Sequence, residues 1–386
     1  MSSENSTPIR FIGAGSFGCT FKPSIPCLTE RANFSGPVYL SKVVNIEKYS
    51  NDAEVRIGEM ITRIPDFESY FAPILQVCVM DSSFLLPDVI EQCSMMAAST
   101  DLSLFVSNLM RYVGTDSLRM YLYEQTTKSV TLGIQATFKT HYHLLRALTS
   151  LQTLSNPIVH FDLKENNVLL DDTTGSPIVI DFGFSFTKEK LMLTTRDKNV
   201  LNELFWSYDG VASGQANDWC LEVDLLSYIS QIPFKHHNVE YSSIIGGTDI
   251  RGLENTVDRY ITKMEFTNSG IFPLEEVETF RDAHKKNLGR FLNYTWGQLI
   301  EYLISTWSSW DNFSLSLIYC TFFGRKQRVH NRLNIFGDSE LNWIVTPQTN
   351  PLMLKYTDMI TKTVLAHPGN LQDPIKTMKN LVALLV

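Results

Sequence analysis

Residues 160–183 read HFDLKENNVLLDDTTGSPIVIDFG, and this stretch is the strongest guide to the fold. Two short apolar runs, 168–170 and 178–180, flank a cluster of turn-forming residues that includes Gly175 and Pro177. Apolar segments on both sides of such a cluster are typical of two strands joined by a short connection. The sequence therefore predicts a tight hairpin here.

The polar residues at the two ends of this hairpin form an ordered set. Asp162 is followed by Lys164 and Asn167, and Asp181 comes directly after the second apolar run. We expect the hairpin to fold Asp181 back toward Asp162 and Asn167. Phosphoryl transfer needs hard oxygen ligands for a metal ion and a carboxylate that orients the attacking hydroxyl. Asn167 and Asp181 are thus the predicted metal ligands. Asp162 would face the hydroxyl, and Lys164 would meet the charge on the transferred phosphate.

This set resembles the catalytic loop and the metal-binding Asp-Phe-Gly triplet of eukaryotic protein kinases. The plain alternative is a buried hairpin with polar caps at its ends. The resemblance implies an α+β, bilobal protein-kinase fold, with a small β-rich amino-terminal lobe and a larger, mainly α carboxy-terminal lobe. We expect these lobes at 1–113 and 114–386, the second with a remodelled activation segment and an insertion at about 187–300.

Composition narrows the functional class. The chain has 386 residues, a formal net charge of -8 and a pI of about 5.5, which argues against a nucleic-acid partner. No apolar run approaches the roughly 20 residues that cross a bilayer, so we expect no membrane span. The scattered cysteines contain no Cys-x-x-Cys pair, and we expect them to be reduced thiols of a soluble intracellular protein. They are Cys19, Cys27, Cys78, Cys93, Cys220 and Cys320.

A glycine-rich segment lies near the amino terminus. Gly13, Gly15 and Gly18 have the G-x-G-x-x-G spacing, which alone is weak evidence. A dinucleotide-binding fold would continue into a helix, whereas residues 19–21 look like a second strand. A hairpin whose backbone N–H groups approach a triphosphate fits better.

The kinase resemblance next requires a lysine on the following strand and a carboxylate on a helix. Lys42 lies in the apolar run 38–44, although an isolated lysine there is often an edge residue. Residues 52–64 have apolar side chains at a helical period. Glu54 on this helix is the better partner for Lys42, and Glu59 is the reserve; either could instead be a solvated surface glutamate.

Residues 108–118 resemble the strand and hinge that join the two lobes of a kinase. Backbone groups of 111–113 would pair with adenine, with Met110 behind the base and Asp116 near the ribose; a strand that ends in a loop is the alternative. The expected cofactors are ATP and Mg2+, with Mn2+ as a substitute metal. The resemblance implies as ATP-binding positions Ile12, Gly13, Gly15, Gly18, Lys42, Glu54, Met110, Tyr112, Val113, Asp116 and Leu169.

The carboxy-terminal half departs from the kinase pattern. A long amphipathic helix is predicted at 134–155, but no Ala-Pro-Glu triplet follows Gly183. Two segments, 219–228 and 310–319, each offer an aspartate that could hold the backbone of the catalytic loop. We prefer Asp311 over Asp224 for this structural role.

Phe161 stands where most kinases carry the arginine that receives a phosphate on the activation loop. We therefore predict activity that does not depend on phosphorylation of that loop.

Several motifs together look like serine/threonine protein kinases of nucleocytoplasmic large DNA viruses, iridovirus-like ones especially. They are IGAGSFGCTFKP at 12–23, IPDFESYF at 64–71, HFDLK at 160–164, WCLEVD at 219–224 and SWDNF at 309–313. The resemblance implies viral or host proteins as substrates and action in infected-cell cytoplasm, with packaging in virions as an open alternative. Lys164 favours seryl and threonyl acceptors. A small-molecule phosphotransferase and a pseudokinase scaffold are the rival functions.

Overall fold

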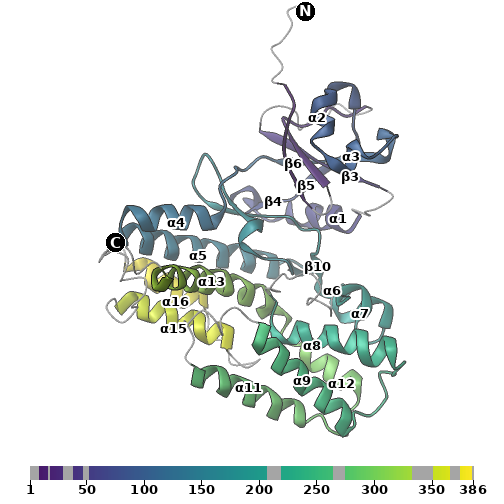
Figure 1. Ribbon diagram of the computed structural model, residues 1–386, viewed down its shortest axis with the longest axis vertical. Coiled ribbons are helices and arrows are strands. Elements are labelled where there is room, and N and C mark those ends of the chain that lie inside the picture. Colours follow the sequence, from purple (N-terminus) through teal and green to yellow (C-terminus); the bar gives the residue numbers. More distant parts are fainter. Residues whose placement is uncertain are drawn as a thin grey trace, which may run out of the picture. The chain divides into compact units, whose positions relative to one another are not determined.

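The structure, a computed structural model, describes residues 8–15, 18–28, 38–46, 52–206, 219–263, 274–332, 351–365 and 374–384. It is mixed α/β, with a small, mainly antiparallel sheet region and a larger helical part (Figure 1). The chain divides into two compact units. The first contains Met1–Asp116 and Asn167–Ser185, and the second contains Ser117–Asn166 and Phe186–Val386.

An antiparallel five-stranded sheet with strand order β1-β2-β3-β6-β5 forms the centre of the first unit. Helix α1 (Asp52–Ile61) packs on β5, where Gly58 lets the helix approach: an added Cβ would lie 2.4 Å from the Ile74 carbonyl oxygen. The predicted glycine-rich hairpin and lysine-bearing strand are both present. The strands are β1 (Arg10–Gly15), β2 (Gly18–Lys22), β3 (Tyr39–Asn45), β5 (Ile74–Val79) and β6 (Phe105–Arg111).

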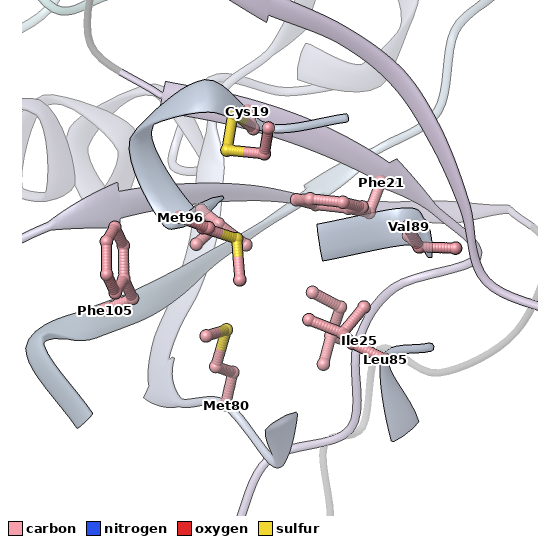
Figure 2. Packing of buried hydrophobic residues seen from close by; sticks show 10 residues of the cluster. Cys19, Phe21, Ile25, Met80, Leu85, Val89, Met96 and Phe105 are labelled. Carbon is pink, nitrogen blue, oxygen red and sulfur yellow. A yellow bond between two sulfur atoms is a disulfide. The ribbon is translucent and has the colours of Figure 1, made fainter. Parts of the chain in front are cut away.

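Short helices between β5 and β6 cover part of this sheet, which the sequence analysis did not foresee. They are η2 (Ser82–Phe84), α2 (Pro87–Glu91), α3 (Ser94–Ala97) and η3 (Leu102–Leu104). Figure 2 shows their apolar side chains, among them Val89 and Met96, packed with Phe21 and Phe105 of the strands. Burial of these side chains holds the short helices to the sheet.

Two disulfides cross-link the same region, so the expectation that all six cysteines are reduced is wrong. Cys19 of β2 is bonded to Cys93, which lies between α2 and α3, and Cys27 is bonded to Cys78 of β5. The Cα atoms of the pairs are 6.0 and 5.7 Å apart. Sequence spacing concealed the pairing because the partners are 74 and 51 positions apart. Cys220 and Cys320 are free and buried.

The hairpin predicted at the start of the analysis is confirmed. Strand β8 (Val168–Leu170) follows the short 3-10 turn η4 (Glu165–Asn167) and pairs antiparallel with β9 (Pro177–Ile180). Strand β4 (Phe71–Ala72), which follows η1 (Phe67–Ser69), adds to β9 in parallel. This pairing places the hairpin in the first unit. The kinase resemblance puts everything after residue 113 in the second lobe, and those lobe boundaries stay a prediction.

The second unit is mainly helical. Figure 1 shows α4, α5, α13, α15 and α16 as a packed group, and α8, α9, α11 and α12 as another. Its helices and strands are α4 (Leu118–Lys128), α5 (Val130–Gln152), β7 (Ile158–Val159), β10 (Phe186–Thr187), α6 (Lys188–Leu193), α7 (Lys198–Leu204), α8 (Leu221–Ile229), the π-helix η5 (Ser230–His236), α9 (Gly247–Lys263), α11 (Leu274–Gly289), α12 (Trp296–Ile304), η6 (Trp307–Ser309), α13 (Trp310–Arg332), α15 (Pro351–Leu365) and α16 (Pro374–Ala383). Most of the described part of 187–300 is thus helical.

Helix α5 forms the core of this unit and starts at a serine cap, with the Ser129 hydroxyl accepting the Leu132 N–H. His141 on its buried face stacks on Tyr319 with ring centroids 4.5 Å apart, and its Nδ1 lies 2.8 Å from the Tyr356 hydroxyl. Burial lowers the pKa of His141 to about 3, so this histidine is neutral at physiological pH. Among the described residues, none of the helices has the length and apolar character to cross a membrane.

Candidate active site

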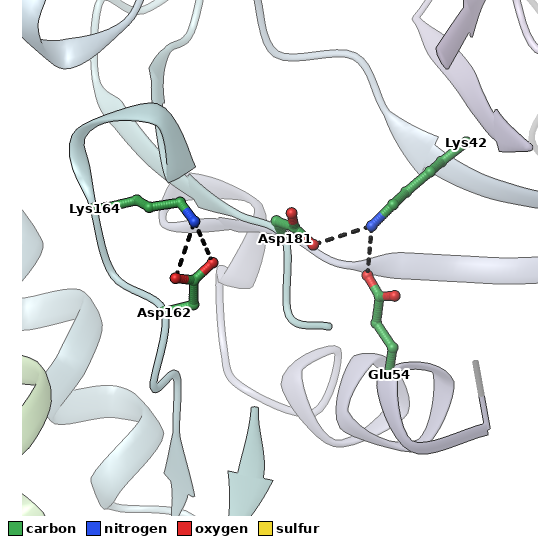
Figure 3. Close-up of polar contacts among 5 residues, drawn as sticks. All are labelled: Lys42, Glu54, Asp162, Lys164 and Asp181. Carbon is green, nitrogen blue, oxygen red and sulfur yellow. Dashed lines mark hydrogen bonds and ion pairs between the residues drawn. The ribbon is translucent and has the colours of Figure 1, made fainter. Parts of the chain in front are cut away.

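The ammonium group of Lys42 is the centre of a polar cluster in the first unit. Its Nζ lies 3.0 Å from Oδ1 of Asp181 and 3.4 Å from Oε1 of Glu54 (Figure 3). Lys42 comes from β3, Glu54 from α1, and Asp181 from the residue after β9. The two carboxylates are 12 and 139 positions from the lysine, so the fold and not local sequence brings them together.

Burial and the neighbouring charges shift the pKa of Lys42 in opposite directions. Burial alone would lower its pKa, but the carboxylates of Glu54 and Asp181 outweigh that effect and raise the pKa above its ordinary value. Lys42 is therefore charged throughout the physiological range. Glu54, the preferred of two candidates on α1, makes the ion pair, and its side chain is buried.

Asp181 lies where the chain leaves β9. Its φ of 61° is in the left-handed region, which aspartate tolerates better than most residues. The next residue, Phe182, is buried with its ring 6.1 Å from that of Phe71 in β4. This anchor fixes the backbone beside Asp181, whose side chain is 38% exposed. The carboxylate therefore has an ion-pair partner on one side and an accessible face.

Asn167 and Asp181 are the predicted metal ligands, and both belong to the first unit. Asn167 is buried directly before β8, and Asp181 directly follows β9, the strand that pairs with β8. An amide oxygen and a partly exposed carboxylate are hard donors of the kind that Mg2+ takes, with water and phosphate oxygens as the other ligands. The residues present thus fit such an ion.

The glycine-rich hairpin has the predicted strand-turn-strand form. Gly15 pairs with Gly18 in the antiparallel register, while Ser16 and Phe17 at its tip lie outside the described residues. Gly18 is required by the sheet, because a Cβ there would lie 2.4 Å from the Val43 carbonyl oxygen. A Cβ at Gly13 would meet nothing within 4 Å, so packing does not explain the glycine there. Ile12 is exposed on the same strand.

The predicted hinge follows β6. Met110 is buried opposite Leu40 of β3, and Lys22 lies over the ring of Tyr112 with its Nζ 3.1 Å from the centroid. The Tyr112 N–H donates to the Val38 carbonyl. Two backbone N–H groups of the β8–β9 hairpin donate to the chain after β6: that of Asp172 to the Val113 carbonyl, and that of Leu170 to the Asp116 carbonyl. The same hairpin carries Leu169. Pairing of 111–113 with adenine stays a prediction.

An ion pair between the hinge and the hairpin escaped the sequence analysis. Nη1 of Arg111 lies 2.6 Å from Oδ2 of Asp171, and Oδ1 of Asp171 accepts the N–H groups of Thr173 and Thr174. Burial raises the pKa of Asp171, but Arg111 and the turn N–H groups outweigh it and hold the pKa below its ordinary value. In the sequence, an Asp at the start of a turn was the available signal for Asp171, but no pattern identified Arg111 as its partner.

Asp162 and Lys164 of the predicted catalytic loop lie in the second unit. Lys164 donates to both carboxylate oxygens of Asp162, at 3.0 and 2.7 Å (Figure 3). The preferred aspartate holds the backbone just before them: the Asp311 carboxylate accepts the His160 N–H at 2.8 Å and the Phe161 N–H at 3.0 Å. The choice of Asp311 over Asp224 is therefore confirmed. Asp162 and Asp181 belong to different units, and their convergence stays a prediction.

Phe161 is buried, and its side chain lies among aromatic rings that sequence analysis did not connect to it. The rings within 6.3 Å of it, between centroids, are those of Phe186, Phe205, Trp219 and Trp310. Phe161 and these four rings carry no positive charge that could bind a phosphate.

Comparison with known proteins finds distant kinase relatives. No protein-family profile matches the chain. The probable inactive serine/threonine-protein kinase samkD of Dictyostelium discoideum is 30% identical over 113 residues, which are 29% of this chain and 19% of that protein. The probable serine/threonine-protein kinases samkB and samkA of the same organism are each 31% identical over 85 residues, or 22% of this chain. Those segments are 14% and 13% of the relatives.

The chain thus spans less than a fifth of the length of each of these relatives. The similarity supports a kinase-like protein, and two of the three relatives are described as probable kinases without the word inactive.

Proposed function

We propose that this chain is a serine/threonine protein kinase with a bilobal kinase fold, which transfers the γ-phosphate of ATP to hydroxyl groups of proteins. The observation that carries the proposal is the contact of Lys42 with both Glu54 and Asp181. Each of the three residues belongs to a different predicted motif. A chance hairpin with polar caps gives no reason for this contact across 139 positions.

In this proposal each residue has a defined role. Lys42, held by Glu54, contacts the phosphates of ATP. Asn167 and Asp181 hold Mg2+, which when bound neutralises charge on the triphosphate. Asp162 orients the acceptor hydroxyl and accepts its proton, and Lys164, already bonded to Asp162, contacts the transferred phosphate.

The experiment is transfer of labelled γ-phosphate to three acceptors: dephosphorylated casein, a glutamate-tyrosine copolymer and a small alcohol such as choline. We expect labelled phosphoserine and phosphothreonine in casein, and a loss of about 10²–10⁴-fold for Asp162→Asn. Transfer only to choline would instead support a small-molecule phosphotransferase. Equal incorporation by the wild type and Asp162→Asn would refute the assignment.

Activity without phosphorylation of the activation segment is part of the proposal. Phe161 stands where most kinases carry a cation that receives the phosphate, and the rings of Phe186 and Trp219 that contact it are uncharged. Protein treated with a phosphatase should therefore retain its turnover rate. A loss of turnover on dephosphorylation, restored by rephosphorylation, would contradict this part.

A scaffold without phosphoryl transfer is the second candidate, because one relative is described as probably inactive. The presence of Lys42, Glu54, Asp162, Asn167 and Asp181 favours the enzyme. If Asp162→Asn retains the full biological effect of the wild type, the scaffold is the better description.

A viral origin, with action in infected-cell cytoplasm on viral or host proteins, is the finer proposal and rests on the motif resemblance alone. Immunoblots of cytoplasm and purified virions from infected cells test it. Absence of the protein from the cytoplasm would contradict the proposed location.

A further inference from the structure

The backbone of Phe161, next to the proposed catalytic Asp162, has an unfavourable conformation. Its φ of 68° is in the left-handed region, which a bulky residue rarely adopts without support. Asp311 holds one side of this residue by accepting its N–H. That contact leaves the carbonyl side, which forms the peptide bond to Asp162, to be held by another group.

Trp219 holds that side. Its indole Nε1–H donates to the Phe161 carbonyl oxygen. The two rings also stack, with centroids 5.0 Å apart and planes 22° from parallel. The indole therefore restrains both the peptide plane before Asp162 and the side chain of the strained residue.

Trp219 is itself anchored by the segment inserted before α13. The Tyr260 hydroxyl of α9 donates to the Trp219 carbonyl at 3.3 Å, and α8 starts two residues after Trp219. Tyr260 is buried. The inserted helices thus hold the backbone of Trp219, which carries the indole, and all these residues belong to the second unit.

We propose that Trp219 is a positioning residue that sets the orientation of Asp162 through the Phe161 carbonyl. The inference rests on the proposed kinase function and gives the inserted segment a role in it. In this arrangement a neutral hydrogen bond and a stacked ring hold the catalytic loop permanently. No phosphate is needed to order it.

The test compares Trp219→Phe, which keeps an aromatic ring and removes the donor, with Trp206→Phe as the matched control. Trp206 is an exposed tryptophan in the same unit. With ATP and dephosphorylated casein, we expect kcat of Trp219→Phe to fall about tenfold, the equivalent of one net hydrogen bond. KM for ATP and the melting temperature should match the control.

Amide hydrogen exchange of the peptide 158–166 gives a readout that needs no enzymatic activity. It should speed up in Trp219→Phe and not in Trp206→Phe. Replacement of Trp219 by 3-benzothienylalanine, which keeps the bicyclic shape without the N–H, should reproduce both effects and separates the hydrogen bond from ring size.

The outcomes distinguish this inference from the proposed function. If the wild type transfers no more phosphate than Asp162→Asn, the kinase proposal fails, and the exchange rates alone decide whether Trp219 holds the loop. If the wild type is active but Trp219→Phe and the benzothienyl variant equal the control in kcat and exchange, the inference is overturned. A fall in kcat that only parallels a lower melting temperature, without faster exchange at 158–166, overturns it too.

Discussion

The two units of this protein hold their proposed catalytic residues by different means. In the first unit, ion pairs place the side chains: Lys42 lies between two carboxylates, and Arg111 contacts Asp171. One disulfide, Cys19–Cys93, joins its sheet to the covering helices, and a second, Cys27–Cys78, joins the segment after β2 to β5. In the second unit, backbone hydrogen bonds and aromatic rings place Asp162, and a neutral histidine is buried in the core.

The difference shows that the kind of contact depends on whether a charged side chain or a loop backbone has to be held. The proposed role of Lys42 in phosphate binding requires a charged lysine, and two nearby carboxylates keep it charged despite burial. A loop that aims one carboxylate needs a fixed backbone, and here the Asp311 carboxylate, the Trp219 indole N–H and a stacked aromatic ring supply it. Four experiments test this difference between the units.

Acid should destabilise the second unit most strongly, through His141. Its folded-state pKa of about 3 lies below the ordinary 6.5, so only the unfolded state takes up a proton between those values. The stability that His141 contributes is complete above pH 6.5 and falls as pH drops toward 3, by about 5 kcal/mol at most. Urea unfolding followed across pH 7 to 3 measures it.

The control for this prediction is His237→Gln, since His237 is exposed. His141→Gln should flatten the pH dependence below 6.5, whereas His237→Gln should leave it unchanged. An equal slope in all three proteins would show that the core histidine is not the source.

Reduction should weaken the first unit. A disulfide typically contributes about 2–4 kcal/mol, so a dithiol reductant should lower the melting temperature of this unit. Alkylation and mass spectrometry of denatured protein should find two reactive thiols, Cys220 and Cys320, without reductant and six after reduction. Six reactive thiols without reductant would show that the two disulfides are absent, and the units would then not differ in covalent cross-links.

Loss of the buried carboxylate of α1 should reduce catalysis. Glu54→Gln keeps the side-chain shape but no longer holds Lys42 by charge, and a misplaced group can cost on the order of 10²-fold in kcat/KM. Glu59→Gln is the matched control, because Glu59 is exposed on the same helix. Equal activity of the two variants would mean that the ion pair is incidental.

The smallest effect is expected at the hinge. Asp171→Asn should lose about 1–3 kcal/mol of stability at neutral pH, because Arg111 and the turn lose their charged acceptor. The folded pKa of Asp171 is depressed, so its contribution is present above the unfolded value and lost as pH falls through the folded one.

The difference between wild type and Asp171→Asn should therefore shrink in acid. Asp282→Asn, at an exposed aspartate of α11, is the control. A difference that is independent of pH would argue against the charge on Asp171 as its cause.

Local patterns predicted the parts of the fold that local forces determine. Two short apolar runs on either side of turn formers indicated the β8–β9 hairpin, a helical period indicated α5, and glycine spacing followed by a strand-like segment indicated the β1–β2 hairpin. Glu54 was correctly preferred to Glu59 and Asp311 to Asp224, because each motif restricts its polar residue to a few positions. The helices between β5 and β6 were missed because they are short and are held mainly by burial against the sheet.

By itself, the sequence determined which residues carry the proposed chemistry: the glycines, Lys42, Asp162, Lys164, Asn167 and Asp181 stand in recognisable order. Only the tertiary structure decided what surrounds them. The cysteine pairs, the Arg111–Asp171 contact and the indole of Trp219 on the Phe161 carbonyl join segments 51 to 74 positions apart. Such contacts depend on which surfaces the whole chain buries together, and no short stretch of residues encodes that choice.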